Sequence, residues 1–489
     1  MSEEAIHGLN PRILWKKFHE ISQISRPSKK EERILQYLKD FADDLGLGIK
    51  QDSAGNIVML VAAKPGHEDA RTVILQSHVD MVCEKNRGTD HDFERDPIRL
   101  MRDNGWIKAE GTTLGSDNGI GVAASLAVAL DEDVVHGPLE LLFTVDEETG
   151  LTGASNLQPG FITGKTLLNL DCEEHGVFYV GCAGGQDTVG VLKIEKTNAP
   201  KGLVAHELLV TGLKGGHSGL DIHTGRANAI KLLGRLLRKL EMIDCQVAEI
   251  AGGSKRNAIP REAEATILLA PSDIKRVKEI IDELVQEVLM EYKENDGGLK
   301  IEFRKKERGY DEVFTKDFLA RTVNTILALP HGVVAMSPDI PNLVRTSTNL
   351  ATIVMGEDEI KVETNQRSSI ASTKAYVASS VESVFRLADA EVFFRGSYPG
   401  WKPNLDSEIL LISKGVYKKL FEEEPEIKAV HAGLECGILG DRYPGLDMVS
   451  LGPTIQGAHS PDERVNIDDV EKFYNLLSGI LSELAMGKD

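Results

Sequence analysis

Cysteine is scarce in this sequence, and its few positions are not arranged for a metal or redox site. The 489 residues include five cysteines, an odd number, at Cys83, Cys172, Cys182, Cys245 and Cys436. No two of them have the Cys-x-x-Cys spacing of thiolate zinc sites or redox motifs. We therefore expect reduced and mostly buried thiols. Because no histidine is paired with Cys172 or Cys436, we do not assign a cysteine nucleophile.

Positive charge and long apolar runs are also lacking. Lys and Arg number 56 against 76 Asp and Glu, which gives a formal net charge of -20. This balance repels nucleic acid and anionic lipid, so we expect no nucleic-acid partner. No segment has the apolar length needed to cross a bilayer, and the first residues lack the basic region and apolar stretch of a signal peptide. These absences predict a cytoplasmic, unprocessed protein without a membrane partner.

The length of the chain predicts two domains. A single hydrophobic core stops growing well below 489 residues, and an apolar content of 41% is enough for a core in each domain. Apolar strands such as residues 139–145 alternate with helical patterns, which is typical of an α/β fold with a mixed, largely parallel sheet flanked by helices. We expect residues 1–185 and 398–489 to form this domain, with an inserted α+β domain at residues 186–397.

An apolar strand near residue 75 ends in a His-x-Asp pair, His78 and Asp80. Residues two apart on a strand share a face, so the carboxylate of Asp80 can hydrogen-bond the imidazole nitrogen of His78 that faces away from a bound metal. Such a contact sets the tautomer and the direction of a zinc-binding histidine. Taken alone the pair is a weak signal, and the rest of the chain decides its interpretation.

Acidic side chains and a second histidine follow other strand ends and turns. Asp117 lies in a glycine-rich loop that lacks both the Gly-Lys-Ser/Thr ending and the Gly-x-Gly-x-x-Gly spacing of phosphate-binding loops. Glu148 and Asp171 each follow an apolar strand, and His459 lies in a glycine-containing turn. Sites in open α/β sheets lie beyond the carboxyl ends of the strands, so we expect these side chains to converge with His78. Two imidazoles and three carboxylates suit a pair of zinc-like ions.

Two short patterns predict local structure. Asp103-Asn-Gly105 is a strong hairpin turn. Ser28-Lys-Lys-Glu31 has the spacing of a capping box at the start of a helix, with Gly46 at the helix end.

Five motifs resemble those of the cocatalytic zinc peptidases, and within them the cytosolic aminoacyl-histidine dipeptidases (peptidase D). They are His-Val-Asp-Met-Val, Gly-Ser-Asp-Asn-Gly-Ile-Gly, Asp-Glu-Glu-Thr-Gly, Asn-Leu-Asp and Gly-Ala-His-Ser-Pro-Asp-Glu. The likeness spans nearly the whole chain. It implies two Zn2+ ions per chain, with Co2+ or Mn2+ as alternatives, bridged by Asp117. It also implies that His78 and Asp171 complete one metal site and that Glu148 and His459 complete the other.

The resemblance further implies roles for residues that do not bind metal. Glu147 is the implied general base that takes a proton from the catalytic water, and Asp80 supports His78. In the inserted domain, which is a lid in this family, His217 of Gly-Gly-His-Ser-Gly is implied to help hold the oxyanion. The related enzymes also have a cis peptide bond after the bridging aspartate, so we expect one between Asp117 and Asn118.

Four further residues are candidates for contact with the substrate. Asn257 and Arg367 are expected to hold its carboxylate, Arg367 through a bidentate pair. Glu435 and Gly437 belong to a segment that we expect to form a wall of the pocket.

The expected function is the metal-dependent hydrolysis of small peptides, namely dipeptides of the Xaa-His type and broader. Two alternatives stay open. One is an aminoacylase-like deacylase that uses the same metals with a different carboxylate pocket, and the other is a non-catalytic binding relative of the same fold. The presence of Glu147 together with all five ligands argues against the second. A homodimer also stays open, and with it whether His217 acts in its own or in a neighbouring subunit's site.

Overall fold

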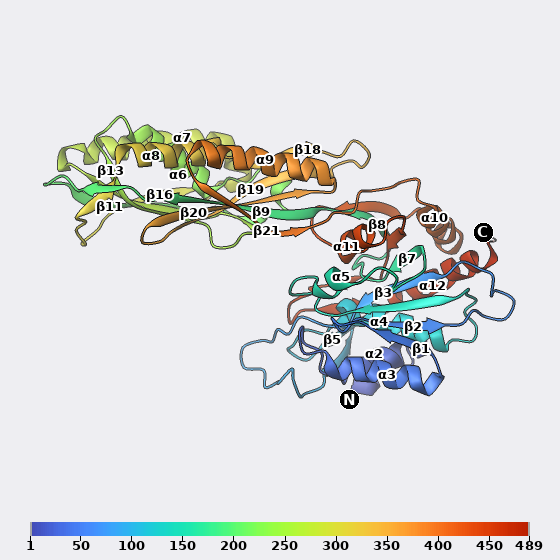
Figure 1. Ribbon diagram of the computed structural model, residues 1–489. Coiled ribbons are helices and arrows are strands. Elements are labelled where there is room, and N and C mark those ends of the chain that lie inside the picture. The colour runs from blue at the N-terminus through green and yellow to red at the C-terminus, as the bar shows by residue number, and fades with distance from the viewer. Residues whose placement is uncertain (1, 488–489) are drawn as a thin grey trace. The chain divides into compact units, whose positions relative to one another are not determined.

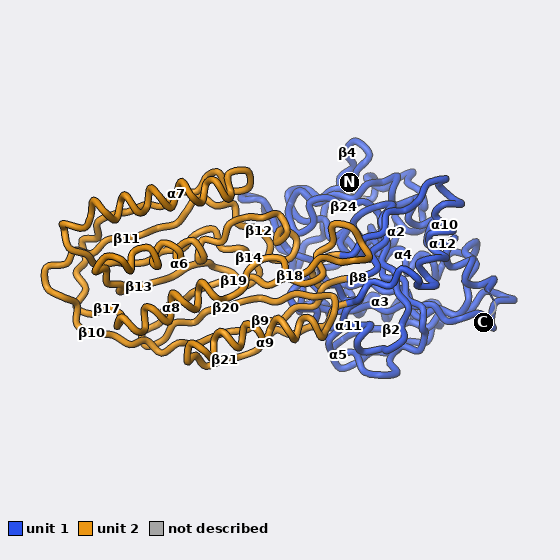
Figure 2. The backbone as a smooth tube through the Cα atoms, turned by 90° about the horizontal axis from the view of Figure 1, so that it is seen from above, with its two compact units in different colours: residues 1–181, 401–429, 434–489 blue, residues 182–400, 430–433 orange. Residues whose placement is uncertain are grey.

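A computed structural model describes residues 2–487 of the chain, which divide into two units (Figure 2). Unit 1 runs to Gly181 and includes Trp401–Ala429 and the chain from Leu434 onward, whereas unit 2 contains Cys182–Gly400 and Val430–Gly433. The sequence pattern placed the boundaries at 185/186 and 397/398. It did not predict that residues 430–433 return to unit 2.

Unit 1 is built on an eight-stranded sheet of order β1-β2-β6-β3-β7-β23-β8-β22. The four central strands, β6, β3, β7 and β23, are parallel, while β2 pairs antiparallel with β1 and β6, and β8 pairs antiparallel with β23. The strands are β1 (Gly48–Gln51), β2 (Ile57–Val61), β3 (Val73–His78), β6 (Leu139–Thr144), β7 (Thr166–Asn169), β8 (Val177–Cys182), β22 (Glu426–Val430) and β23 (Asp447–Ser450). Strands β3, β6 and β7 are buried along their whole length, as parallel strands covered on both faces must be.

Helices cover both faces of this sheet (Figure 1). Helix α4 consists mainly of small and aliphatic residues, is buried on nearly every side, and packs between β3 and α2. On the opposite face, Cys436 and Leu439 of α11 pack on Ile74, Leu142 and Leu167. The helices of unit 1 are α1 (Ser2–Ala5), α2 (Arg12–Ser22), α3 (Glu32–Leu45), α4 (Ser116–Leu130), α5 (Thr152–Asn156), α10 (Glu408–Phe421), α11 (Glu435–Arg442) and α12 (Ile467–Met486).

A second, four-stranded sheet of order β24-β25-β5-β4 completes unit 1. Its hairpin β4 (Leu100–Asp103) and β5 (Trp106–Ala109) turns at Asn104 and Gly105, both with positive φ, so the predicted Asp-Asn-Gly turn is confirmed. The other two strands are β24 (Ile455–Gln456) and β25 (Arg464–Asn466). The turn between them carries His459.

Unit 2 is an antiparallel sheet with four long helices on one face (Figure 1). The strand order is β16-β11-β15-β13-β19-β20-β9-β21, with β18 beside β19. The strands are β9 (Gly184–Lys193), β11 (Val204–Thr211), β13 (Gln246–Gly252), β15 (Ala263–Leu269), β16 (Lys300–Lys305), β18 (Gly332–Met336), β19 (Val344–Met355), β20 (Glu359–Ser368) and β21 (Glu391–Tyr398). The helices α6 (Ala229–Leu240), α7 (Ile274–Asp296), α8 (Lys316–Ala328) and α9 (Ala371–Leu387) enclose one continuous apolar core with this sheet.

Short elements fill the connections of unit 2. They are β10 (Lys196–Asn198) paired with β17 (Glu312–Phe314), β12 (Gly216–His217) paired with β14 (Ala258–Ile259), and the 3-10 turns η1 (Ile222–Thr224) and η2 (Pro271–Asp273). The predicted fold class, an α/β unit with an inserted α+β unit, is therefore confirmed.

The predicted capping box before α3 is wrong. Helix α3 begins at Glu32, and neither Ser28 nor Glu31 makes a side-chain cap. The Ser28 hydroxyl donates instead to Asp80 Oδ2 at 2.7 Å, and Glu31 Oε1 accepts from the Asp146 amide at 3.0 Å. Both side chains therefore hold segments that carry candidate site residues. The hydrogen bond from Ser28 to the ionised carboxylate of Asp80 is stronger than one between two neutral groups.

Candidate metal centre

Three neighbouring parallel strands deliver three of the predicted ligands to one edge of the unit 1 sheet. Strand β3 ends at His78 and lies between β6, which leads to Glu148, and β7, which leads to Asp171. The imidazole of His78 is 1% exposed, and its Nε2 lies 3.3 Å from Asp171 Oδ1. Sheet order alone therefore brings together residues that are about 20 to 90 positions apart in sequence.

Asp117 stands between two imidazoles. Its Oδ1 lies 3.1 Å from His78 Nε2, and its Oδ2 lies 3.2 Å from His459 Nε2. His459 Nε2 is also 3.0 Å from Glu148 Oε2. The five predicted ligands thus form two triads of donor atoms that share Asp117, one with His78 and Asp171 and the other with Glu148 and His459.

The loop that presents Asp117 has the predicted unusual backbone. The Asp117-Asn118 peptide bond is cis, so this prediction is confirmed. Gly115 before it has φ of +69°, and the side-chain Nδ2 of Asn118 donates to the carbonyl of Leu170 at 2.8 Å and also to Asp171 Oδ1.

Asp80 faces the other nitrogen of His78. Its Oδ1 lies 3.4 Å from His78 Nδ1, so Nε2 points to the carboxylates and Nδ1 to Asp80. The backbone amides of Glu147 and Glu148 donate to the two oxygens of Asp80 at 3.0 and 3.2 Å. Burial would raise the pKa of Asp80, but the contacts with His78, Ser28 and the Glu147 amide lower it to about 2. Asp80 therefore stays ionised and orients His78 and the loop of residues 147–148 together.

Negative charge accumulates among these residues. Burial, opposed by His78 and reinforced by Asp117 and Glu148, raises the pKa of Asp171 to about 6. The hydrogen bonds that the His459 imidazole donates to the carboxylates of Asp117 and Glu148 raise the pKa of His459 to about 11. The donors fit divalent cations chemically: they are imidazole nitrogens and carboxylate oxygens, and Glu148 Oε1 is buried without a hydrogen-bond partner among residues 2–487. A pair of cations would relieve the repulsion that this cluster otherwise contains.

Glu147 differs from its neighbour Glu148 in its surroundings. No hydrogen-bond donor of the described residues reaches its carboxylate. Burial raises its pKa well above the ordinary value, His78 opposes this shift, and the charges of Asp171 and Glu435 add to it. A carboxylate with an elevated proton affinity beside the two triads has the property that a general base needs.

Glu435 and Gly437 lie on α11, on the sheet face that also carries Gln76. Glu435 Oε2 accepts hydrogen bonds from Gln76 Nε2 at 2.6 Å and from Thr144 Oγ1 at 2.9 Å, and burial raises the pKa of its carboxyl group to about 7. Gly437 donates its amide to the carbonyl of Leu434 at 3.0 Å.

The three remaining candidates lie together in unit 2. His217 on β12 pairs with Ala258, next to Asn257, and His217 Nδ1 accepts hydrogen bonds from the amides of Gly219 and Leu220 at 3.2 and 3.1 Å. Burial and the charge of Arg367 lower the pKa of His217. The imidazole is therefore neutral, and its proton is on Nε2, where it is available as a hydrogen-bond donor.

Arg367 is a buried cation without an acidic partner in unit 2. It lies on β20, is 5% exposed, and donates to the hydroxyls of Ser218 at 3.4 Å and Tyr398 at 3.1 Å. Among the described residues of unit 2, no carboxylate pairs with it. Buried charges are normally paired, so this guanidinium is suited to an anionic group of a ligand. The side chain of Asn257 is exposed.

The sequence pattern missed several residues around the site. They are Arg26, Ser28, Glu31, Gln76, Thr144 and Glu463, and each contacts a candidate ligand, its loop or Glu435. Glu463 lies within a quoted motif, so its position was a usable signal. Ser28 and Glu31 have only the pattern of a helix cap, and the others have no local pattern, because their partners are distant in sequence.

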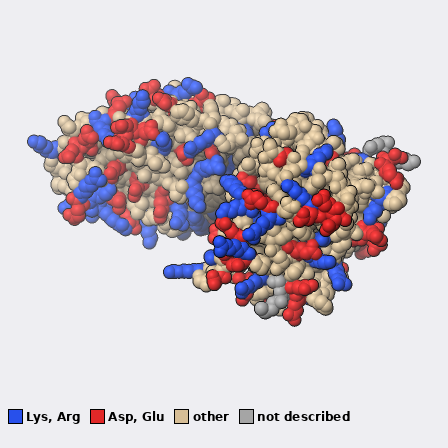
Figure 3. Space-filling model, turned by 60° about the horizontal axis from the view of Figure 1, so that its bottom comes forward, with Lys and Arg blue, Asp and Glu red and all other residues tan. Residues whose placement is uncertain are grey.

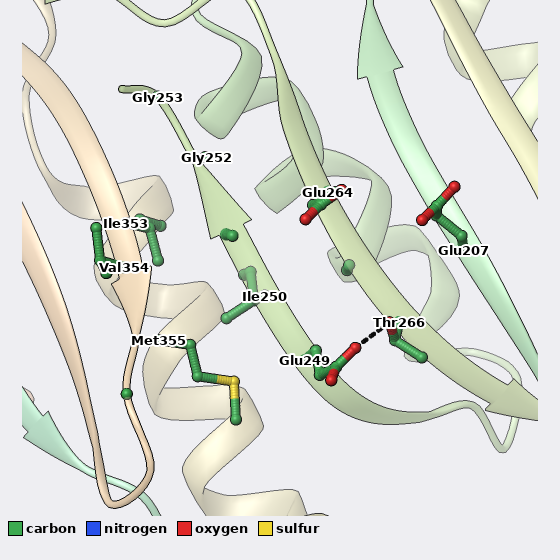
Figure 4. Close-up of a pocket in the computed structure, with 13 residues that line it drawn as sticks. Glu207, Glu249, Ile250, Gly252, Gly253, Glu264, Thr266, Ile353, Val354 and Met355 are labelled. Carbon is green, nitrogen blue, oxygen red and sulfur yellow. Dashed lines mark hydrogen bonds between the residues drawn. The ribbon is translucent and has the colours of Figure 1, made fainter. Parts of the chain in front are cut away.

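A separate hollow of about 460 Å³ lies on the sheet of unit 2 (Figure 4). Glu207, Glu249 and Glu264 line one side of it, and Ile353 and Met355 line the other. The hollow lies where strands β13 and β19 pair through a single pair of residues, Gly252 and Ile353. None of the predicted site residues lines it.

An α/β unit with an inserted α+β unit and two carboxylate-histidine triads at the sheet edge defines a metallopeptidase architecture. In agreement, residues 74–483 match peptidase family M20/M25/M40, and the chain belongs to this family. The prediction of an enzyme of the metallopeptidase class is thereby confirmed.

Two relatives resemble the chain over almost its whole length. The cytosol non-specific dipeptidase of Escherichia coli K12 is 41% identical over 488 residues, which cover 99% of each chain. The crystal structure of aminoacylhistidine dipeptidase from Vibrio alginolyticus is 42% identical with a TM-score of 0.92, again over 99% of each chain. A tripeptidase from Staphylococcus aureus has a TM-score of 0.58 at 17% identity over 98% of this chain, which shows a shared fold alone.

Across residues 2–487, no helix has both the length and the apolar character that a membrane span requires.

Proposed function

We propose that this protein is a dinuclear metal-dependent dipeptidase. The observation that carries the proposal is the pair of donor triads that share Asp117, with one imidazole on each of its oxygens. Whole-length similarity to a protein named cytosol non-specific dipeptidase supports the substrate class. Two Zn2+ ions per chain, or Co2+ or Mn2+, suit the donor set.

Each residue has a distinct part in this reaction. When bound, the two ions polarise the scissile carbonyl and make the catalytic water more acidic. His78 and Asp171 would hold one ion and Glu148 and His459 the other, with Asp117 as the ligand that the two triads share. Glu147 takes the proton of the water on its carboxylate and passes it to the leaving amine, and Asp80 keeps His78 oriented.

Unit 2 serves as the lid and supplies groups for the substrate. The Nε2 proton of His217 donates to the oxygen that becomes negative in the transition state, a role supported by the two amides that occupy Nδ1. Arg367 pairs with the free carboxylate of the dipeptide, and Asn257 assists it. Glu435 and Gly437 form part of the pocket wall. The substrates are dipeptides of the Xaa-His type and broader.

We further propose that the protein acts in the cytoplasm, as the name of the Escherichia coli relative states for that protein. It takes small peptides and not nucleic acid, in keeping with its net charge of -20.

Four substrates test the proposal: a dipeptide such as Ala-His, its N-acetyl form, its C-terminal amide and the tripeptide extended at the C-terminus. A carboxylate contact one residue beyond the scissile bond favours the dipeptide, and loss of a charged contact leaves a buried partner unpaired at a cost of about 1–3 kcal/mol. We therefore expect kcat/KM for the amide and the tripeptide to fall about tenfold or more.

The Arg367→Met variant provides the matched control. It should lower activity on the dipeptide and leave the amide nearly unchanged, because the amide lacks the carboxylate that Arg367 contacts. Equal kcat/KM for the four substrates would contradict the dipeptidase assignment. Preferred cleavage of the N-acetyl form would instead indicate the aminoacylase-like deacylase.

A further inference from the structure

Two buried residues of opposite charge flank the loop that carries Asp117. Arg26 lies in the connection between α2 and α3, Glu463 immediately precedes β25, and each is 2% exposed. Neither is a candidate metal ligand. Burial lowers the pKa of Arg26, and among the negative charges that oppose this shift the carboxylate of Glu463 has the largest effect.

The carboxylate of Glu463 receives five hydrogen bonds from this loop. Its Oε2 accepts from the amides of Leu114 at 2.8 Å and Gly115 at 3.0 Å. Its Oε1 accepts from the amide and hydroxyl of Ser116 at 2.7 and 2.6 Å, and from the amide of Asp117 at 3.3 Å. A carboxylate has about four lone-pair positions, so these donors leave Glu463 no capacity to bind a metal.

Arg26 holds carbonyl groups of the same loop and of its neighbour. One guanidinium nitrogen donates to the carbonyls of Val79 and Asp80, each at 2.9 Å, and another donates to the carbonyl of Gly115. The fit is close: a Cβ on Gly115 would lie 2.5 Å from the guanidinium and 2.8 Å from the sulfur of Met81. Glycine is required here both for this approach and for its positive φ.

Together the two residues connect three segments that carry candidate ligands. Arg26 joins the segment after His78 to the loop of Asp117, and Glu463 joins that loop to the turn of His459. The backbone amides of the loop face the carboxylate of Glu463, and the carbonyl of Gly115 faces the guanidinium of Arg26. The loop therefore cannot rotate without breaking charge-assisted hydrogen bonds.

We infer that Arg26 and Glu463 are positioning residues that hold Asp117 so that one of its oxygens faces each metal ion. This inference rests on the proposed dinuclear function. Without the pair, the carboxylate of Asp117 can turn toward one ion, and the other ion loses a ligand. Binding of the second ion should then weaken much more than binding of the first.

The test uses the full chain with Co2+ as the probe, titrated into metal-free protein and followed by calorimetry and visible absorption. Glu463→Gln keeps the shape of the side chain but turns an amide group toward amide donors. Arg26→Lys keeps the charge but removes the planar fork. The double variant R26M/E463Q removes both charges at once, so it leaves no buried charge unpaired and is the variant best suited to fold.

For these variants we expect binding of the second Co2+ to weaken at least tenfold, while the first stays within threefold of the unaltered protein. At a Co2+ concentration that fills both sites of the unaltered protein, kcat should fall at least tenfold, with KM within threefold.

Glu140→Gln is the matched control. Glu140 is also a buried carboxylate of unit 1, and it accepts from the amides of Thr163 at 2.8 Å and Gly164 at 3.0 Å, but it lies at the amino end of β6. Its substitution should lower thermal stability without weakening either Co2+ site. Tryptophan fluorescence measures this stability in unit 1, because Trp15, Trp106 and Trp401 all lie there.

The inference is overturned if the double variant binds two Co2+ ions with unchanged affinities, or if Glu140→Gln weakens the second site as much as Glu463→Gln does. If one single variant fails to fold, the double variant and Arg26→Lys still test the inference. If the unaltered protein binds fewer than two Co2+ ions or cleaves no dipeptide, the proposed function fails instead, so the two failures are distinguishable.

Discussion

Glu147 and Glu148 are adjacent, yet they have different surroundings. Glu148 Oε2 lies 3.0 Å from His459 Nε2 within a donor triad, whereas the carboxylate of Glu147 has a raised pKa and no hydrogen-bond donor among the described residues. The difference arises because both backbone amides are held by Asp80, which fixes the directions of the two side chains. The two adjacent glutamates therefore have the different surroundings that the roles proposed for them require.

We predict that Glu147→Gln keeps two bound metal ions and lowers kcat about 10²–10⁴-fold, because the amide cannot take a proton. Elemental analysis and steady-state kinetics measure the two effects. Glu132→Gln, at an exposed position in unit 1, is the control and should change neither. Near-normal kcat in the Glu147 variant would rule out this residue as the base.

The ligand assignment predicts different metal contents for two substitutions. His459→Ala removes a donor of one triad and should leave about one tightly bound ion per chain, whereas Asp117→Ala removes the shared donor and should weaken both. Inductively coupled plasma analysis after dialysis measures this. His7→Ala, which removes an exposed imidazole, should retain two ions. Two ions in the His459 variant would contradict the assignment.

At the scale of elements, the segment between β22 and α11 carries a histidine into unit 2. His431 is buried, its Nε2 lies 2.7 Å from Ser347 Oγ, and a Cβ on Gly219 would lie 2.1 Å from its carbonyl oxygen. Burial, with the charge of Arg367, lowers the pKa of His431 to about 3. The folded protein therefore keeps this imidazole neutral where the unfolded chain protonates it.

From this we predict that unit 2 loses stability as the pH falls below about 6.5, the pKa of an unperturbed histidine. The unfolded state binds the extra proton between that value and the folded pKa of about 3, so stability rises with pH across this window. By pH 5 the loss amounts to roughly 2 kcal/mol.

Urea unfolding at pH 7 and pH 5 measures this effect when far-UV circular dichroism, which reports both units, is compared with tryptophan fluorescence, which reports unit 1. His431→Gln should make the difference smaller, and His223→Gln, at an exposed position of the same unit, should leave it unchanged. An equal pH dependence in the His431 variant would show that other groups cause it.

At the scale of the whole molecule, the chain has a formal net charge of -20. Acidic and basic side chains are interspersed on the face shown in Figure 3. The concentrated negative charge is internal to unit 1, at the carboxyl ends of β3, β6 and β7. The two units have separate cores, so metal binding should act on one of them.

We predict that chelation lowers the melting temperature of unit 1 and leaves that of unit 2 in place. A ligand held at a thousand times its dissociation constant stabilises the folded state by about 4 kcal/mol, and this term disappears with the metal. Tryptophan fluorescence reports unit 1 alone, since all three tryptophans lie there, while circular dichroism reports both units. Zn2+ added in excess of the chelator should reverse the shift. An equal shift of both transitions would contradict a site confined to unit 1.

The sequence by itself determined what depends on near neighbours along the chain. Strand β3 ends at His78, and Asp80, two residues on, still lies 3.4 Å from the imidazole, as the alternation of side chains along an extended segment predicts. The Asp103-Asn-Gly105 turn forms because Asn104 and Gly105 adopt positive φ, and apolar strands followed by acidic residues place the candidate ligands at a sheet edge. The cis bond after Asp117 followed from the family resemblance.

Only the tertiary structure decided which distant groups meet. Ser28 has the pattern of a helix cap, yet its hydroxyl donates to Asp80, 52 residues away. Glu463 meets amides about 350 positions earlier, and Arg26 meets carbonyls from two separate loops. A hydrogen bond depends on distance and direction in space, and the packing of the whole unit sets both. Local periodicity contains no information about them, so the sequence could propose the candidate ligands but could not assign Ser28 and Arg26 to the loops that these residues hold.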